Sequence, residues 1–386
     1  MRPIALVLCG SRRINKRIAR FAESLHGSGF DPVLAAFPRR QWATSSIEDP
    51  ALVGTRRFAT LRRADPAPRQ HGRFQRPALI VCTHWSLLPL AVILKLLFQV
   101  PLVYDEHDHY ELLAFEAGGP PWANRVRSRV IGIVHAWFLP RTDLVTCIRL
   151  AGGQLKASLD AHAPTVIELH NYPSRRWADG RGDRTDPSDS IAIVYVGGIW
   201  AEKGCAAMLD AFVRLADDPS LPMLTLHAFG SGDPEIEQRL SVAARTTFHG
   251  SVPYEEIVTF LAEHDCLGLV LLEATARYTQ ASTNCHKLYE YLAAGVPVLA
   301  TDVGELAGIV AAADGGWTIP PGLEAKELAD AIREIVSDPQ EVRRRGEAAA
   351  AAMDRDGLWW DAEWAKVEGT GVLDCSQGPL SGATDV

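Results

Sequence analysis

The feature that most constrains the fold is an alternation of short apolar runs with segments of helical spacing, which occurs twice along the chain. In the first half, apolar runs at 4–8, 31–36, 78–82, 101–104, 143–147 and 165–169 predict strands, and 15–25 and 122–138 predict helices. Runs without a polar face are typical of a parallel sheet that helices cover on both sides. The pattern therefore predicts βαβ units in an α/β domain.

A second alternation follows a polar stretch at 174–190, which is rich in Arg, Asp, Gly, Ser and Pro as in a linker. Beyond it, strands are expected at 191–196, 224–229, 246–249, 266–271 and 296–301, with helices at 205–216, 235–244, 254–262, 287–294 and 325–336. A chain of 386 residues accommodates two such domains. We expect two doubly wound α/β domains, 1–173 and 191–364, facing each other across a cleft, and a partly disordered tail, 365–386.

The two halves carry opposite net charge. Residues 1–173 hold 22 Lys and Arg against 13 Asp and Glu, a balance of +9; the whole chain holds 39 and 47, so 17 against 34 remain, a balance of −17. Seven arginines lie from Arg56 to Arg76, and five basic residues from Arg12 to Arg20. These clusters are either a solvated surface or an attraction for an anionic acceptor or lipid surface.

The cysteines and apolar runs bear on the compartment. Seven cysteines are scattered singly without a C-x-x-C pair, which is typical of a reduced, cytoplasmic protein. The first apolar run is too short for a signal peptide. Lys95, Gln99 and two prolines interrupt the apolar segment 85–104, so a helix followed by a strand explains it better than a membrane span. We expect a cytoplasmic protein that is either free or peripheral to the inner face of the membrane.

Residues 282–299 predict an anion-binding helix N-terminus. The Ser-Thr-Asn run at 282–284 offers N-cap residues, and a Gly-x-Pro ends the helical spacing that follows. Backbone N–H groups at such an end bind phosphate, and Lys287 adds positive charge. Glu290, three residues further on the same face, is placed to accept hydrogen bonds from a ribose diol. The alternative is a Lys-Glu surface pair on an ordinary helix.

A glycine turn supports the phosphate interpretation. The strand at 191–196 ends in Gly197-Gly198, and Lys203-Gly204 then enters a helix. Glycines allow backbone to approach a phosphate closely, and the lysine supplies a cation. The alternative is a tight strand-to-helix turn with a solvated lysine.

These segments resemble a known family. YVGGIWAEKG, LHAFGSGDPEIEQRL, FHGSVPYEEI and NCHKLYEYLAAGVPVLATDVGE stand in the order and spacing of the C-terminal domain of GT-B glycosyltransferases of the family 4 type. VPLVYDEHDHYE, DLVTCI and LHNYP resemble the N-terminal acceptor domain of that family. The resemblance covers the chain up to about residue 364 and implies two Rossmann-like domains.

The resemblance also implies roles for single residues. Glu290 corresponds to the ribose-binding glutamate, Lys203 to the lysine that meets the diphosphate, and the backbone at 283–285 to the phosphate-cradling turn. Gly230, Ser231 and Val252 resemble the loops around the nucleobase. The candidate donor-binding residues are Gly198, Lys203, Gly230, Ser231, Val252, Thr283, Asn284, Cys285, Lys287 and Glu290.

Two positions depart from the family pattern. Members often carry an arginine five residues before the lysine, where this chain has Gly198, and many carry a glutamate eight residues before the ribose glutamate, where it has Ser282. One phosphate contact and one sugar contact are therefore absent at these positions.

The run Tyr104–Glu111 is the candidate acid–base region, because histidines and carboxylates crowd a loop at the end of a buried strand. His107 matches a family histidine near the transferred sugar and is the favoured catalytic residue, with Asp105 second. The H-x-H spacing of His107 and His109 hints at a metal, but no third ligand is evident. The loop 10–13 is expected to border the acceptor, where Arg12 or Arg13 would contact an anionic group.

The sequence thus predicts a glycosyltransferase that moves a hexosyl group from a UDP-, GDP- or dTDP-sugar to an acceptor hydroxyl. The resemblance implies retention of configuration and no metal or other cofactor, and the acceptors it suggests belong to the cell envelope or to natural products, either anionic or membrane-presented. No nucleic-acid partner is expected. The alternatives are a nucleotide-sugar epimerase or hydrolase on the same fold and a non-catalytic binding partner.

Overall fold

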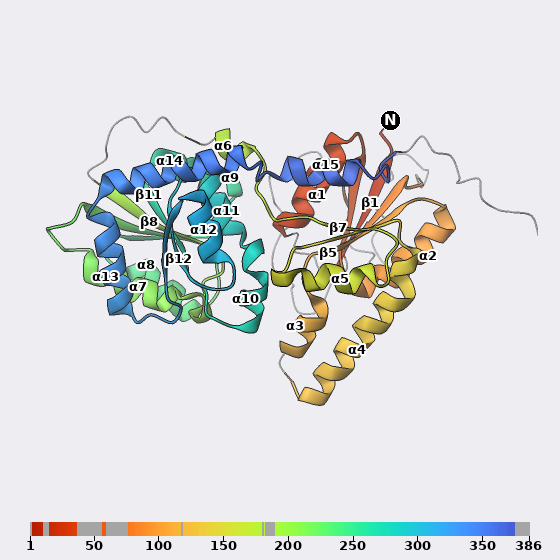
Figure 1. The fold of residues 1–386 in the computed structure, drawn as a ribbon, viewed down its shortest axis with the longest axis horizontal. Coiled ribbons are helices and arrows are strands. Elements are labelled where there is room, and N and C mark those ends of the chain that lie inside the picture. Colours follow the sequence, from red (N-terminus) through yellow and green to blue (C-terminus); the bar gives the residue numbers. More distant parts are fainter. Residues whose placement is uncertain are drawn as a thin grey trace, which may run out of the picture. The chain divides into compact units, whose positions relative to one another are not determined.

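The chain divides into two compact units, the first formed by Met1–His170 with Glu363–Val386 and the second by Asn171–Ala362. The structure is a computed structural model, and it describes residues 2–10, 15–36, 56–58, 76–116, 119–179, 181 and 190–374. Each unit is built around one parallel β-sheet with helices on its faces (Figure 1). The predicted pair of α/β domains is therefore confirmed.

The first unit holds a seven-stranded sheet in the order β3-β2-β1-β4-β5-β6-β7. Every neighbouring pair runs parallel. The strands are β1 (Ile4–Cys9), β2 (Asp31–Ala36), β3 (Arg56–Phe58), β4 (Leu79–Cys82), β5 (Leu102–Glu106), β6 (Leu144–Cys147) and β7 (Val166–Glu168). The helices are α1 (Lys16–Gly27), α2 (Leu88–Phe98), α3 (Tyr110–Glu116), α4 (Pro121–Phe138) and α5 (Gln154–Asp160). The strand order reverses between β1 and β4, and the carboxyl ends of these strands form the edge where such sheets bind ligands.

A buried ion pair ties α1 to the middle of this sheet. Arg17 and Asp105 are 2% and 0% exposed, and the Arg17 guanidinium donates to both carboxylate oxygens of Asp105 at 2.8 to 3.1 Å. Thr146 Oγ1 donates to the same carboxylate at 2.7 Å, and Arg17 Nη1 donates to the Leu169 carbonyl at 3.1 Å. These contacts link α1, β5, β6 and the end of the first unit's main segment.

The second unit holds a six-stranded sheet in the order β10-β9-β8-β11-β12-β13, again parallel throughout. The strands are β8 (Ser190–Val196), β9 (Met223–Phe229), β10 (Thr246–Gly250), β11 (Cys266–Val270), β12 (Val298–Thr301) and β13 (Gly316–Ile319). The helices are α6 (Arg176–Asp179), α7 (Cys205–Leu215), α8 (Pro234–Val242), α9 (Tyr254–Glu263), α10 (Ala276–Ala281), α11 (His286–Ala293), α12 (Leu306–Ala313), α13 (Ala325–Val336) and α14 (Pro339–Arg355).

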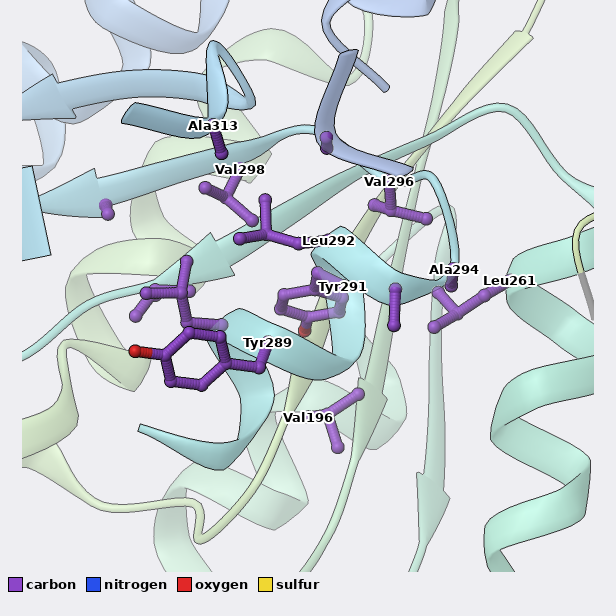
Figure 2. Packing of buried hydrophobic residues seen from close by; sticks show 14 of the residues in the cluster. Val196, Leu261, Tyr289, Tyr291, Leu292, Ala294, Val296, Val298 and Ala313 are labelled. Atoms are coloured by element: carbon purple, nitrogen blue, oxygen red, sulfur yellow. The ribbon is translucent and has the colours of Figure 1, made fainter. Parts of the chain in front are cut away.

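Helix α11 lies within the core of the second unit and is fixed there by one side chain. The Tyr291 ring packs where a Cβ on Gly268 of β11 would come within 2.7 Å of it, and its hydroxyl donates to the Val194 carbonyl of β8 at 3.0 Å. Figure 2 shows Tyr291 among Leu292, Val196 and neighbouring apolar residues of one cluster. Because α11 carries the sequence-predicted donor residues, this anchor sets their position.

The domain boundaries differ from the predicted ones at both places where the chain passes from one unit to the other. The expected linker 174–190 contains α6, whose Trp177 is 1% exposed in the core of the second unit, because an apolar indole there packs against Tyr254. The unit boundary near the C-terminal end falls within α15 (Trp360–Glu368), so 363–368 belong to the first unit and not to a tail. Trp364 packs edge-on against Phe21 of α1. The expected disorder of 375–386 lies outside the described residues.

We predict that Arg17→Met lowers the stability of the first unit by about 3–5 kcal/mol, because it leaves the Asp105 carboxylate buried without its cation. Thermal and urea unfolding measure the loss. The double variant Arg17→Met with Asp105→Asn is expected to recover part of it. Lys156→Met, which removes an exposed pair with Asp160, serves as the control and costs less than about 1 kcal/mol. Equal losses for Arg17→Met and Lys156→Met would contradict the structural role of this pair.

Candidate functional site

Two loops at the carboxyl edge of the second sheet run against each other so closely that only glycine fits. A Cβ on Gly230, whose φ is +135°, would lie 1.8 Å from the carbonyl oxygen of Gly197, and one on Gly232 would lie 2.1 Å from that of Ile199. Gly197 N donates to Phe229 O at 2.9 Å, and Gly230 N donates to the carbonyl of Gly250 at 2.7 Å. The loops after β8, β9 and β10 thus form one backbone surface, which we call the glycine seam (Gly197–Ile199 and Gly230–Gly232).

The predicted donor-site residues of these loops come together at the glycine seam. Gly198 and Ser231 lie on adjacent loops, since Ile199 N donates to Ser231 O at 3.1 Å. Ser251, next to Val252, donates its hydroxyl to that of Ser231 at 3.2 Å. Val252 itself is partly buried and packs against the core. The sequence prediction that these positions are neighbours therefore agrees with the geometry.

Lys203 lies at the same seam. A Cβ on Gly198 would come within 3.2 Å of Lys203 Nζ and within 2.6 Å of the Trp200 indole nitrogen. The indole occupies the space that the family arginine at position 198 would need, so the first departure from the family pattern has a local steric reason. Burial lowers the pKa of Lys203, and the nearby charge of Arg277 on α10 lowers it further. Sequence reasoning missed Arg277.

Lys287 supplies a second cation to the seam from the opposite side. It lies four residues before Tyr291, so both side chains face the sheet, and its Nζ is 4.0 Å from the centre of the Tyr195 ring. A Cβ on Gly197 would be 3.9 Å from the same nitrogen. Lys287 Nζ is buried without a hydrogen-bond partner. Burial lowers its pKa to about 8, and the charge of Lys203 contributes to that lowering.

The turn before α11 is less open than the sequence suggests. Ser282, Thr283 and Asn284 form a 3-10 turn with buried side chains, and the N-cap is Cys285, whose side chain accepts no capping hydrogen bond. Cys285 N donates to Ser282 O at 3.2 Å, so this N–H serves the turn itself. The predicted Ser-Thr-Asn cap is therefore wrong, because these residues pack into the protein.

The second departure from the family pattern also has a structural reason. Ser282 Oγ accepts from Glu305 N at 2.9 Å and donates to Thr279 O at 3.0 Å. A Cβ on Gly304 would come within 2.3 Å of the same oxygen. Ser282 thus joins α10 to the loop after β12 in a space too small for a glutamate.

Glu290 is buried, with 1% of its surface exposed. The Tyr254 hydroxyl donates to its Oε1 across 3.5 Å, and Tyr254 in turn packs on Trp177. Lys287 and Glu290 therefore do not form the exposed surface pair that was the alternative to a donor site.

In the first unit, His107 lies at the carboxyl end of β5 between a carboxylate and a phenol. Its Nδ1 is 3.8 Å from Asp105 Oδ2, and its Nε2 is 3.1 Å from the Tyr110 hydroxyl. The His107 side chain is 13% exposed, whereas Asp105 is fully buried and bound by Arg17. His107 can therefore meet a substrate, while Asp105 is placed to orient its ring. Asp105 was the second predicted catalytic residue, but it is fully buried and bound by Arg17, so it is not exposed to a substrate.

His84 lies beside Tyr110, and sequence reasoning did not identify it. It lies two residues after the end of β4, and its ring centre is 4.9 Å from that of Tyr110. A Cβ on Gly10 would lie 2.4 Å from its ring. Its Nδ1 accepts from Ser86 N at 3.2 Å. The signal that could have found it is its position shortly after a predicted strand, beside the strand that leads to His107.

Glu106, the last residue of β5, is fully buried in a polar network of its own. The Tyr104 hydroxyl donates to Glu106, and His135 Nε2 lies 3.5 Å from Glu106 Oε2. Burial raises the pKa of Glu106 to about 7. Within the described ranges, no three His, Cys, Asp or Glu side chains gather so as to hold a metal. Arg12 and Arg13 lie outside the described residues.

Residues 190–338 match the family model of Glycosyl transferases group 1. Glycogen synthase of Mycobacterium tuberculosis is 26% identical over 305 residues, which are 74% of this chain and 67% of that protein. Alpha-D-kanosaminyltransferase of Streptomyces kanamyceticus is 24% identical over 180 residues, which are 44% of this chain and 42% of that protein.

Solved structures share the fold over nearly the whole chain. Sucrose-phosphate synthase from Thermosynechococcus elongatus has a TM-score of 0.61 at 19% identity, covering 96% of this chain and 98% of its own. HepE of Anabaena in complex with UDP-glucose has a TM-score of 0.62 at 18% identity, covering 95% and 98%. The two parallel α/β units and these structural likenesses define the GT-B fold. The second unit carries the Glycosyl transferases group 1 domain, and the sequence relatives support glycosyltransferase function.

We predict that Lys287→Met weakens the binding of an anionic ligand, probed with UDP, about 10- to 100-fold, as expected for loss of a charge-assisted hydrogen bond. The same change is expected to raise the melting temperature of the unliganded protein at pH 7, because a buried ammonium with a lowered pKa destabilises the folded state below pH 8. That penalty disappears as pH rises from about 8 towards the ordinary lysine value. Calorimetric titration and thermal unfolding measure both effects. Lys326→Met on the exposed face of α13 is the control. If Lys287→Met were less stable than the wild type and kept full UDP affinity, Lys287 would not be the anion-binding cation.

We predict that UDP affinity of the wild type falls as pH rises from about 7.5 to 9.5, because the free protein loses the Lys287 proton near pH 8 and must regain it to bind an anion. In Lys287→Met, UDP affinity is expected to fall less over the same pH range, because only Lys203 remains to lose its proton. Titrations in buffers of different ionisation enthalpy measure the proton uptake. Identical pH profiles for the two proteins would contradict this origin.

Proposed function

We propose that the protein is a family 4 enzyme that transfers a hexosyl group from a nucleotide diphosphate sugar to an acceptor hydroxyl, with retention and without a metal ion. The observation that carries the proposal is the pair of lysines at the glycine seam. Lys203 and Lys287 approach adjacent glycines, and neither forms an ion pair with a carboxylate of the described residues. Two cations placed together, neither in an ion pair with a carboxylate of that described part of the chain, indicate an anionic ligand.

A diphosphate fits this arrangement chemically. In the transfer, the bond between the anomeric carbon and the diphosphate oxygen breaks, and negative charge builds up on the leaving phosphate. Fixed ammonium groups in a partly dry site stabilise that charge more strongly than water does. Lys203 and Lys287 would thus supply the charge stabilisation that a divalent ion supplies in other phosphate-transferring sites. The glycine seam would let the backbone approach the phosphates closely.

Related proteins support a nucleotide-sugar donor. HepE of Anabaena has been solved in complexes with UDP and with UDP-glucose. The seam residues Gly230 and Ser231, together with Val252, would then surround the base of a UDP-, GDP- or dTDP-sugar. Glu290, one turn beyond Lys287 on α11, would accept hydrogen bonds from the ribose. We propose UDP as the first nucleotide to test.

His107 is proposed to act on the acceptor side of the reaction. It is the one histidine of its loop that lies between a positioning carboxylate, Asp105, and a phenol, Tyr110. An acceptor hydroxyl must lose its proton as its oxygen bonds to the anomeric carbon. The leaving phosphate can take this proton, with His107 orienting the acceptor or assisting the transfer.

We predict that Glu290→Ala weakens UDP binding at least about tenfold, since a charged acceptor for the ribose diol is lost. Calorimetric titrations with UDP and with inorganic pyrophosphate separate the ribose contribution. Pyrophosphate has no ribose, so its affinity should be the same in Glu290→Ala and in the wild type. Tyr254→Phe removes only the neighbouring hydroxyl and is the folding control. Unchanged UDP affinity in Glu290→Ala would remove Glu290 from the donor site.

We predict that His107→Asn lowers sugar transfer by about 10²- to 10⁴-fold without changing the UDP-induced shift in melting temperature. A panel of nucleotide sugars, screened first by thermal shift and then by nucleotide release with product analysis, provides the assay. Exposed His162→Asn is the control in the same unit. Full activity of His107→Asn would remove it from the reaction, and isomerised donor as the product would replace transfer by epimerisation.

A further inference from the structure

Helix α4 presents its apolar stripe to solvent. Its exposed large hydrophobic residues recur at intervals of four, four, three and four, which places them along one face, and each is 43% to 68% exposed: Trp122, Val126, Val130, Ile133 and Trp137. The residues of this helix that are buried against the first unit are Asn124, Ser128, Ile131 and His135. A surface helix of a globular protein normally has the opposite arrangement. The outer face of α4 is therefore built for a non-aqueous contact.

Helix α2 adds a second exposed apolar surface next to α4. Leu90, Ile93, Leu96 and Leu97 are 36% to 69% exposed. The two helices pack together, as Figure 1 shows, and are joined near their carboxyl ends, where Lys95 Nζ donates to the Arg141 carbonyl at 2.9 Å and Arg141 donates to the Trp137 carbonyl. Of the 13 exposed large hydrophobic residues in the described ranges, these nine lie on two helices, so they are not a random scatter. We call them the α2–α4 apolar face.

Basic residues flank this face and acidic ones are missing from both helices. Arg125, Arg127 and Arg129 of α4 are exposed, and the sequences of α2 and α4 contain no Asp or Glu. At about 3.6 residues per turn, Arg125 and Arg129 border one side of the apolar stripe and Arg127 the other. Tryptophans at the two ends of a helix, with arginines along both borders, are the composition of helices that lie in a membrane interface.

The positive charge of the flanking arginines decides which partner fits the α2–α4 apolar face. A second copy of the chain docked face to face would bring two sets of arginines together, which is unfavourable. An anionic lipid surface instead pairs the arginines with headgroup phosphates while the apolar side chains enter the acyl boundary. No helix in the described part of the chain is long and apolar enough to cross a membrane, so the contact would lie in the plane of the interface.

We propose that the α2–α4 apolar face inserts into the interfacial region of an anionic lipid bilayer and docks the first unit there. The contact uses none of the residues assigned to the donor or to His107, so it stands independently of the proposed function. It also gives the enzyme direct access to an acceptor that a membrane presents.

Co-sedimentation with vesicles tests the proposal on the full-length protein. Vesicles of equal parts phosphatidylglycerol and phosphatidylcholine are expected to bind it, and pure phosphatidylcholine much less. Trp122→Gln with Trp137→Gln should lower the partition coefficient at least about tenfold through lost apolar burial. Replacing Arg125, Arg127 and Arg129 by Gln should lower it about a hundredfold at low ionic strength. The matched control replaces the exposed Val213, Met223 and Val242 of the second unit by Gln, and it should bind as the wild type does.

Three outcomes would overturn the proposal: no binding to either vesicle, equal loss in the control and the tryptophan variant, or a wild-type dimer that the tryptophan variant converts to a monomer without any lipid binding. The last result would assign the face to a second copy, and light scattering on a sizing column detects it. UDP titrations of the same variants should match the wild type. A failure of lipid binding with intact UDP binding therefore leaves the proposed function untouched, and the reverse result leaves the membrane contact untouched.

Discussion

The close approach of two backbone segments at the carboxyl edge of the second sheet is the constraint on which the proposed donor region depends. Because Gly230 lies against the carbonyl of Gly197, the loops after β8 and β9 cannot carry side chains at their crossing. Their functional groups must therefore come from either side, Lys203 from the 3-10 turn before α7 and Lys287 from α11. The sheet edge provides the backbone surface, and the flanking helices provide its charge.

Burying the Lys287 ammonium carries a desolvation penalty, and the surrounding residues offset part of it. Lys287 is carried by a helix whose Tyr291 is buried against β11 and β8, and this anchor fixes the backbone from which the lysine reaches the Tyr195 ring. The Tyr195 ring face compensates part of the lost hydration. The first unit handles charge differently, since Arg17 and Asp105 neutralise each other fully inside the sheet. One unit stores an unpaired cation where a ligand is proposed, and the other pairs its charges for stability.

Periodicity and glycine placement predicted both sheets, most of their strands and the clustering of Gly198, Lys203 and Ser231. They could not tell which stripe of an amphipathic helix faces inwards, and for this reason the outward apolar face of α4 and the inward Lys287 became visible only with the neighbouring elements in place. Short elements of mixed composition, such as α6 and β13, lack a periodic pattern long enough to detect. The steric reasons for Gly198 and Ser282 depend on Trp200 and Gly304, contacts that no local pattern contains.

The second unit is inserted into the first. The chain leaves the first unit after His170 and returns at Glu363, and the backbone N–H of His170 donates to the Glu363 carboxylate at 2.9 Å, which closes the insertion. On the ribosome, all residues of the inserted unit emerge before Trp364 can reach Phe21 and Ser28 of α1. Part of α1 in the first unit therefore stays uncovered until Trp364 has been made, whereas the inserted unit can complete its own folding without a later segment.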